Sequence, residues 1–320
     1  MNKGHKKLHQ FDEHHAELKG FSKYFYLEIF PFLAAQDGHR REALRKSILW
    51  GSFIVGIAVV LAIFTYLRGK ISLSFFVIAG AVIVNLGLYS WLMKSVRGYT
   101  KDSIVGAICS YIGWVFEAEV YRKPDLEILE TYRLIPRGFT KNTSSRRALF
   151  EDEMSGEAHG AQFRSIEAHF ETKSDDNWTT TLRGQIMTLT FPRKFLGQTV
   201  VLRDKGLLQS KKFGDMKRVG LVDPVFERIF EAYSTDQVES RYLLDPVFMQ
   251  KLVDLEQSVD GKKICFGFLG GKLHIVVQTP NRYEAGSMLK PLTAPERTQK
   301  ILDEIGVIYD IVDTVLKPNS

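Results

Sequence analysis

Two long uncharged apolar runs constrain this chain more than any other feature of its sequence. The first is SILWGSFIVGIAVVLAIFTYL, residues 47–67, and the second is ISLSFFVIAGAVIVNLGLYSWLM, residues 71–93. At about 1.5 Å of rise per residue, a helix of either length reaches roughly 30 Å, the thickness of the hydrocarbon core of a bilayer. The pair predicts a transmembrane helical hairpin rather than two buried core helices. Asn85, a strongly polar side chain within the second run, is expected to hydrogen-bond to the partner helix.

The positive charge of the chain is concentrated around these runs. The net charge of +6 divides into +3 for residues 1–46, +4 for residues 47–100 and −1 for residues 101–320. Basic residues flank the hairpin on both sides and outnumber those of its loop, so the positive-inside rule predicts that both termini are cytoplasmic. The neutral C-terminal part lacks the basic surface that phosphate binding needs, which argues against nucleic acid as a partner.

The rest of the chain divides by its apolar spacing. Residues 1–46 predict an N-terminal cytoplasmic helical arm that is disturbed near Pro31. An apolar stripe at helical spacing over residues 104–116 predicts a juxtamembrane helical segment, assigned to residues 94–130. Residues 131–320 form the predicted cytoplasmic domain.

This domain carries several β-strand signals. Residues 162–173 and 179–191 are rich in Thr, Phe and Ile around a turn cluster and predict a hairpin, with a third strand at 198–203. Residues 263–278 predict a second hairpin, because its two central glycines suit a two-residue turn. The sequence therefore predicts an α+β fold, in which the transmembrane hairpin precedes a domain with a mainly antiparallel sheet packed by helices.

The register of the second hairpin follows from the turn at Gly270 and Gly271. It pairs Ile264 with Val277 and gives the hairpin one uniformly apolar face. His274 falls on the other face, where we expect a half-exposed strand residue rather than a catalytic base.

The tetrapeptide Asp-Pro-Val-Phe occurs twice, beginning at Asp223 and at Asp245. Aspartate favours the N-cap of a helix and proline favours the first helical position, so each copy predicts a helix start. Near the C-terminus, the sequence from Thr293 predicts an amphipathic helix. This helix can pack on its own domain or on a partner, and the pattern does not separate these alternatives.

Two groups of polar residues are candidates for ligand or partner binding. Glu167 and His169 have the i, i+2 spacing that places two strand residues on one face, where a carboxylate and an imidazole can do acid–base work. Asp236, Glu239 and Arg241 lie within about two turns of a predicted helix, and the guanidinium can bind an anion. The structural alternatives are a solvated strand face and a capped helix with an internal ion pair.

The sequence carries no motif that points to a known chemistry. It lacks a glycine-rich phosphate loop, a Gly-x-Ser-x-Gly elbow, a His-Glu-x-x-His motif and a Cys-x-x-Cys pair. His5 with His9, and His9 with Glu13, have the i, i+4 spacing of metal ligands, but no further ligand motif supports them. We therefore predict no catalytic residue, no metal site and no cofactor.

Several segments together carry a family resemblance. The run VDPVFERIFEAYSTDQVESRYLLDPVFMQKL is followed by ICFGFLGGKLHIVV and preceded by FEDEMSGEAHGAQFRSIEAHFETK and TLRGQIMTLTFPRKFLGQTVVL. With the apolar hairpin, these segments resemble the bacterial membrane-protein family called domain of unknown function 3137. The resemblance implies a location in the bacterial inner membrane and, as a partner, a LemA-type membrane protein. It implies no reaction.

These observations predict a membrane-anchored, non-enzymatic cytoplasmic module that binds a protein or a small ligand at the inner membrane. The first alternative is a membrane-proximal enzyme that uses the Glu167 and His169 pair or the Asp236, Glu239 and Arg241 group. The second alternative is a structural subunit of a membrane complex. The expected partners are the lipid bilayer, another membrane protein or a second copy of the chain.

Overall fold

The computed structural model describes residues 9–13, 15–203, 215–259, 263–284 and 286–317. The chain forms two compact units. The helical unit comprises Met1–Ile108 and Tyr283–Leu302, and the sheet unit comprises Cys109–Arg282 and Asp303–Ser320. Each unit is described by itself.

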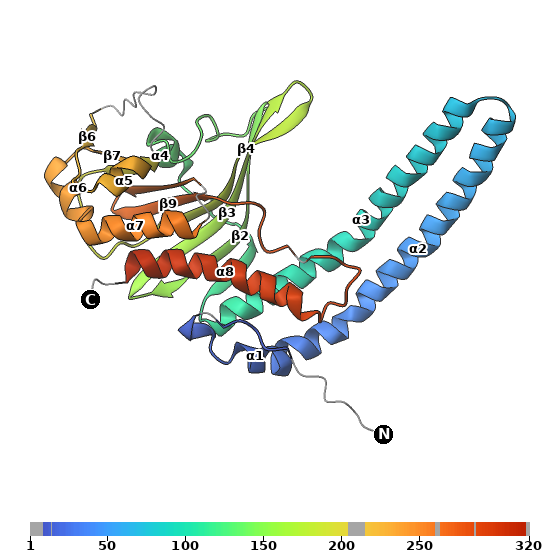
Figure 1. Cartoon of the computed structure of the whole chain (residues 1–320), viewed down its shortest axis with the longest axis horizontal. Helices are drawn as coiled ribbons and strands as arrows, with labels where there is room; N and C mark the ends of the chain where they lie inside the picture. The colour runs from blue at the N-terminus through green and yellow to red at the C-terminus, as the bar shows by residue number, and fades with distance from the viewer. Residues whose placement is uncertain (1–8, 14, 204–214, 260–262, 285, 318–320) are drawn as a thin grey trace. The chain divides into compact units, whose positions relative to one another are not determined.

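The helical unit is dominated by two long helices (Figure 1). Helix α1 (Phe21–Tyr24) and a π-helical turn (Phe25–Ile29) lead into α2 (Phe30–Leu67), which has Pro31 in its first turn. Helix α3 (Ile71–Tyr111) follows directly. The expected disturbance near Pro31 takes the form of this π turn and a new helix start, because proline lacks the N–H that a helix interior needs.

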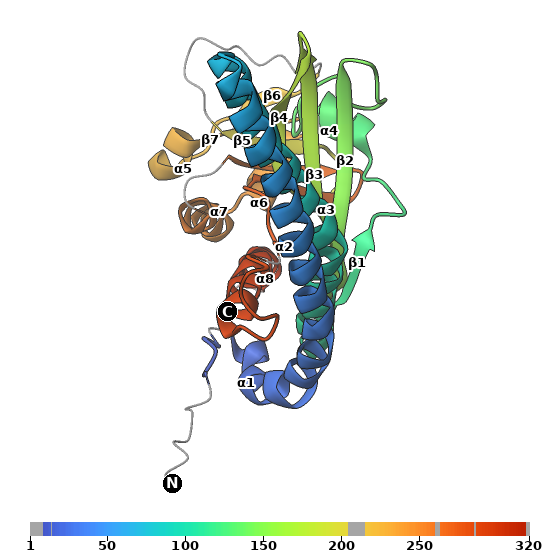
Figure 2. The same ribbon diagram turned by 90° about the vertical axis from the view of Figure 1, so that its right-hand side faces the viewer.

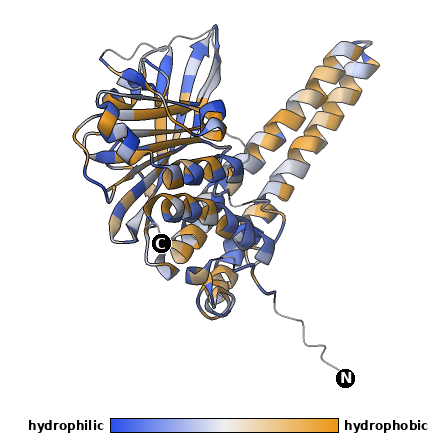
Figure 3. Cartoon of the chain, turned by 60° about the vertical axis from the view of Figure 1, so that its left-hand side comes forward, coloured by the Kyte–Doolittle hydropathy of each residue, from blue (hydrophilic) through white to orange (hydrophobic). Residues whose placement is uncertain are grey.

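Both long helices present apolar side chains outward. Phe75 and Phe76 are 78% and 74% exposed, and Val60 is 67% exposed. Figure 3 shows the apolar colouring along both helices. A surface of this kind is unfavourable in water, and both helices are long and apolar enough to cross a membrane.

Asn85 makes a different contact from the one that the sequence predicts. Its amide nitrogen donates to the carbonyl of Ala81 on its own helix, at 3.0 Å. Its side-chain oxygen packs against Gly51 of α2, where an added Cβ would meet it at 2.5 Å. The small glycine permits this close approach of the two helices.

A buried ionic contact holds the return segment, which is the part of the helical unit formed by Tyr283–Leu302. Asp37 accepts a hydrogen bond from the Arg40 guanidinium at 2.6 Å and another from the backbone N–H of Leu292 at 3.0 Å. Arg40 also donates to the carbonyl of Met288 at 3.0 Å. The bond from Arg40 is the main cause that lowers the pKa of Asp37 to about 2, although burial opposes it. The charged pair therefore ties the return segment to α2.

The described strands of the sheet unit form one nine-stranded sheet in the order β1-β2-β3-β4-β9-β8-β5-β7-β6, and all neighbours are antiparallel. Figure 2 shows the long strands β2, β3 and β4 side by side. The strands are β1 (Val115–Glu119), β2 (Arg146–Ala158), β3 (Ala161–Ser174), β4 (Asn177–Leu189), β5 (Thr199–Arg203), β6 (Lys217–Val219), β7 (Phe230–Ser234), β8 (Ile264–Leu269) and β9 (Lys272–Gln278). The predicted α+β class with a mainly antiparallel sheet is confirmed.

Helices lie on both faces of this sheet. They are α4 (Leu126–Thr131), α5 (Pro224–Ile229), α6 (Gln237–Leu243), α7 (Pro246–Ser258) and α8 (Pro295–Leu316). On the face that we call the α4 face, Leu129 of α4 packs in one buried cluster with Phe170 and Val276. On the opposite, α7 face, Phe248 of α7 contacts Phe268 of β8.

Local signals in the sequence locate several of these elements. Asp223 and Asp245 cap α5 and α7 through their side chains, as predicted. The pairing of Ile264 with Val277 confirms the predicted register of the β8–β9 hairpin. The interaction of each aspartate with backbone N–H groups one turn ahead satisfies donors that the helix itself leaves open.

Three sequence predictions were wrong in detail. Helix α3 ends at Tyr111, so Phe116, the last residue of the predicted helical stripe, lies in strand β1. Strand β2 was missed, because acidic residues interrupt its alternation and a register shift between Glu151 and Met154 breaks its period. His274 is buried rather than half-exposed, and its burial lowers the pKa of the imidazole to about 4.

The close approach of β4 and β9 yields a stability prediction. A Cβ on Gly184 would lie 1.9 Å from the carbonyl oxygen of Val277, so the Gly184→Ala variant must push the two strands apart. We expect its free energy of unfolding to fall by about 2 kcal/mol or more in chemical unfolding of the detergent-solubilised chain.

The matched control is Gly220→Ala, because a Cβ at Gly220 meets nothing within 4 Å. This variant should stay within about 0.5 kcal/mol of the wild type. Equal stability of the Gly184 and Gly220 variants would refute the register of β4 against β9.

Candidate functional site

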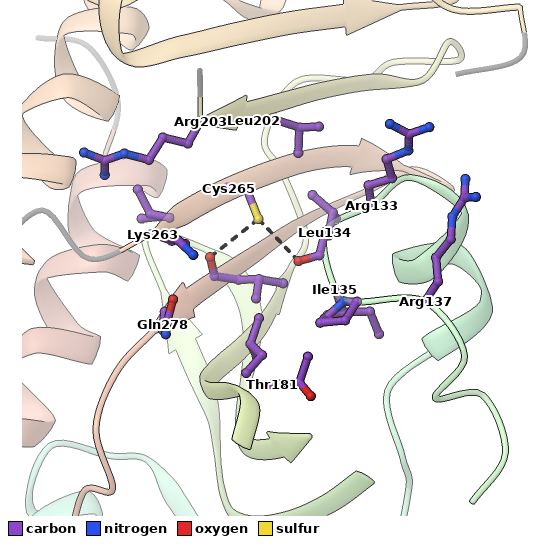
Figure 4. A pocket seen from close by; sticks show the side chains of 14 residues that line it. Arg133, Leu134, Ile135, Arg137, Thr181, Leu202, Arg203, Lys263, Cys265 and Gln278 are labelled. Carbon is purple, nitrogen blue, oxygen red and sulfur yellow. Dashed lines mark hydrogen bonds between the residues drawn. The ribbon is translucent and has the colours of Figure 1, made fainter. Parts of the chain in front are cut away.

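A cavity of about 760 Å³ lies on the α4 face of the sheet unit (Figure 4). We call it the cationic cavity, because four basic residues and no acidic residue are among its described lining residues. The basic residues are Arg133, Arg137, Arg203 and Lys263. The remaining side chains are apolar or uncharged, and include Leu134, Ile135, Thr181, Leu202, Ile264, Cys265, Val276 and Gln278.

Three separate segments position the basic residues. Arg133 and Arg137 follow α4, Arg203 is the last residue of β5, and Lys263 directly precedes β8. Figure 4 shows the two arginines after α4 on one side of the cavity and Arg203 and Lys263 on the other, with Cys265 between them. The cavity therefore has cationic sides around a largely apolar middle.

Arg133 has an unusual backbone conformation. Its φ is 58°, in the left-handed region that glycine favours. It stands just past the end of α4, where the N–H of Leu134 donates to the carbonyl of Leu129 at 2.9 Å and closes the helix. Glycine is the usual residue at such a position, so the arginine is held there at some conformational cost.

The basic residues of the cavity differ in their partners. The Arg203 guanidinium donates to the Glu256 carboxylate, which neutralises its charge. Arg137 and Lys263 have no ion-pair partner within the described ranges, and both side chains are exposed. At least two of the lining residues therefore carry a positive charge that no carboxylate of the described residues pairs with.

Cys265 lies in the middle of the cavity as a thiol. Its sulfur is 3.5 Å from the carbonyl oxygen of Leu134 and 3.7 Å from that of Val276. Burial raises its pKa to about 12, against a smaller opposing effect of the bond to Val276. Because the thiolate is the nucleophilic form, this cysteine is not activated for covalent chemistry.

The predicted pair Glu167 and His169 lies on the α7 face, on the opposite side of the sheet from the cavity. Glu167 is buried, its Oε1 is 3.0 Å from Arg183, and its Oε2 accepts from the backbone N–H of Arg282 at 3.4 Å. His169 instead contacts the Thr180 hydroxyl at 2.8 Å. The two side chains share the face that their spacing predicts, but each is bound to a separate partner.

The second predicted group serves the start of α6. Asp236 accepts from the backbone N–H groups of Val238 and Glu239, at 2.8 and 2.9 Å. Glu239 accepts from the N–H groups of Leu196 and Gly197, each at 2.7 Å, and so holds the preceding loop. Arg241 donates to the carbonyl of Gln237 at 2.8 Å. The three residues therefore cap α6 and bind it to the preceding loop. No ion pair joins Arg241 to either acid in the described structure.

The two predicted groups do not come together. No hydrogen bond or ion pair among the described residues joins Glu167 or His169 to the α6 group. The reasoning from sequence also missed the four basic residues of the cationic cavity. They are 4 to 130 positions apart along the chain, and only the spacing of Arg133 and Arg137 was a local signal.

The histidines of the N-terminal arm give no metal centre in the part of the chain that is described. Glu13 accepts from the N–H groups of Gly20 and Ser22, at 2.7 and 2.8 Å. His9 is described, whereas His5 lies outside the described residues. Within the described ranges, no group of three or more His, Cys, Asp or Glu side chains is placed to hold a metal ion.

The fold and the cavity define an antiparallel α+β sheet unit in a chain with an apolar helical hairpin. Residues 180–317 match the family model described as protein of unknown function (DUF3137), which confirms the family resemblance over this segment. The match includes Arg203, Lys263 and Cys265 of the cavity, whereas Arg133 and Arg137 precede it.

Comparison with solved structures found the crystal structure of the mycobacterial trehalose monomycolate transport factor A, TtfA. It is 15% identical, covers 70% of this chain and 97% of that chain, and has a TM-score of 0.31. A likeness this low supports no statement about the function of this chain. The comparison with curated proteins found no match.

The buried position of Glu167 yields a pH prediction. Burial raises the pKa of this carboxyl from 4.5 to about 7, although Arg183 opposes the rise. The folded state therefore holds this proton more tightly than the unfolded state, so the stabilisation is complete below pH 4.5 and is lost as the pH rises through about 7. Relative to Glu167→Gln, the wild type should lose on the order of 1–3 kcal/mol of unfolding free energy across this window.

Glu171→Gln is the matched control on the same strand face. The Arg147 hydrogen bond lowers the pKa of Glu171, so this group stabilises the fold above its unfolded pKa and loses its contribution as the pH falls. The free energy of unfolding of the wild type minus that of each variant can be measured by urea unfolding at several pH values. This difference should fall with rising pH for Glu167→Gln and rise with rising pH for Glu171→Gln. Slopes of the same sign would contradict the described environment of Glu167.

Proposed function

We propose that this chain is a membrane-anchored, non-enzymatic module of the bacterial inner membrane, whose cytoplasmic sheet unit binds a small ligand in the cationic cavity. The observation that carries the proposal is the cavity itself, with four basic residues around an apolar middle and no acidic residue among its described lining. Cavities of this size and mixed lining are typical of small-ligand sites.

The engagement of the polar side chains supports binding rather than catalysis. Glu167, Glu239 and Asp236 each accept hydrogen bonds that hold strands, a loop or a helix start. Cys265 is a protonated thiol, since burial raises its pKa to about 12. A reaction needs a nucleophile or base within reach of a substrate, and these groups are committed to other contacts.

The charge pattern supports the proposed orientation. Basic residues precede α2's apolar run and follow that of α3, whereas the connection between the helices carries Arg68 and Lys70. Positive residues are retained preferentially on the cytoplasmic side, which supports a connection outside and a sheet unit inside.

Labelling of engineered cysteines tests the orientation. Lys70 and Lys217 are both exposed, the first between the two helices and the second in β6 of the sheet unit. In spheroplasts, a membrane-impermeant maleimide should label Lys70→Cys at once and Lys217→Cys only after lysis.

The wild type is the control, because Cys109 is buried within α3 and burial raises the pKa of Cys265 to about 12, so both react slowly. Labelling of Lys217→Cys in sealed spheroplasts would overturn the proposed location of the sheet unit.

A further inference from the structure

We infer that the ligand of the cationic cavity is an amphipathic anion, a molecule with a phosphate or carboxylate group attached to an apolar chain. The inference rests on the proposed function, because it names the ligand class of the same cavity. Three independent features of the lining lead to it: its charge, its apolar middle and the backbone of Arg133.

The charge of the lining requires an anion. Arg137 and Lys263 enter the cavity lining without an ion-pair partner in the described part of the chain, and Glu256 neutralises only Arg203. Like charges gathered around one cavity repel one another, and a bound anion relieves this repulsion. Arginine also offers two parallel N–H donors, which match the oxygens of a phosphate or a carboxylate.

The middle of the cavity requires an apolar body. Pro136, Leu182 and Cys265 line it and are half-buried, so part of their apolar surface still meets solvent. The buried side chains of Leu202 and Val276 lie beside them in the lining. A small inorganic anion would leave these side chains in contact with water. An apolar chain attached to the anion would instead remove them from water, at roughly 25 cal/mol for each Å² of apolar surface buried.

The backbone of Arg133 indicates which side holds the anionic group. A residue that ends a helix in the left-handed conformation is usually glycine, and an arginine there is unfavourable unless its side chain has a role. Here the strained position places Arg133 in the cavity lining, four residues before Arg137. The anionic group therefore lies at the side formed by Arg133 and Arg137, and the apolar chain extends toward Leu202 and Val276.

Equilibrium dialysis of octyl phosphate tests the ligand class. The full chain is placed in phosphatidylcholine nanodiscs, and empty nanodiscs provide the blank. We expect saturable binding of octyl phosphate, whereas octanol and inorganic phosphate should each bind at least about tenfold more weakly. If octanol binds as well as octyl phosphate, the ligand does not need an anionic group. If inorganic phosphate binds as well, the ligand does not need an apolar chain. Either result would overturn the inference.

Two variants locate the site. Arg137→Gln removes an exposed charge, and Arg133→Gly removes the guanidinium while giving the strained position its favoured residue. Each should weaken octyl phosphate binding by at least about tenfold, and Arg133→Gly should keep a melting temperature at or above that of the wild type. Arg228→Gln, an exposed arginine on α5, is the matched control and should bind as the wild type does.

Unchanged binding in Arg137→Gln and Arg133→Gly would overturn the inference. If Arg133→Gly unfolds, the exposed Arg137→Gln decides alone. Nanodiscs enriched in phosphatidic acid distinguish the source of the ligand, since competition with octyl phosphate identifies a bilayer lipid and its absence identifies a soluble amphiphile. If cysteine labelling confirms the orientation but octyl phosphate does not bind, the inferred ligand class is wrong. The proposal of a membrane-anchored module would not be affected.

Discussion

The alternation of side chains along the central strands separates the two faces of the sheet, and the rest of the sheet unit depends on that separation. Phe170 and Val276 point to the α4 face, while Glu167 and its ion-pair partner Arg183 lie on the α7 face. A slip of one residue in any of these strands would exchange the faces. It would bury the ionic groups in the apolar cluster and remove the lining of the cavity.

Charged side chains are arranged differently on the two faces of the sheet. On the α7 face, carboxylates and guanidinium groups pair with one another, as in Arg183 with Glu167 and Arg147 with Glu171. On the α4 face, basic residues line a cavity without an acid among its described lining residues. Paired charges stabilise or specify a fold, whereas lining charges such as those of Arg137 and Lys263, which have no ion-pair partner within the described ranges, are typical of binding sites. Because of this contrast, we propose that ligand binding occurs on the α4 face.

Much of the fold could be predicted from the sequence because its signals are local. Asp245 caps a helix through a backbone N–H only three residues ahead, and the β8–β9 register depends on the glycines of its own turn. The cavity could not be predicted in this way. Arg137 and Lys263 come to line the same cavity only through the order of the strands, and the strain at Arg133 is visible only in the backbone. Glu167 and Asp236 were conspicuous in the sequence because polar residues that hold a fold together have the same types as those that bind a ligand.

The most direct measurement is native mass spectrometry of the chain purified from its own membranes, with the bound molecule released and identified by fragmentation. We expect a small anion with an apolar chain, bound to the wild type and to Arg228→Gln but depleted in Arg137→Gln. A wild-type chain that carries no such molecule, or an Arg137→Gln variant that carries the same amount, would contradict it.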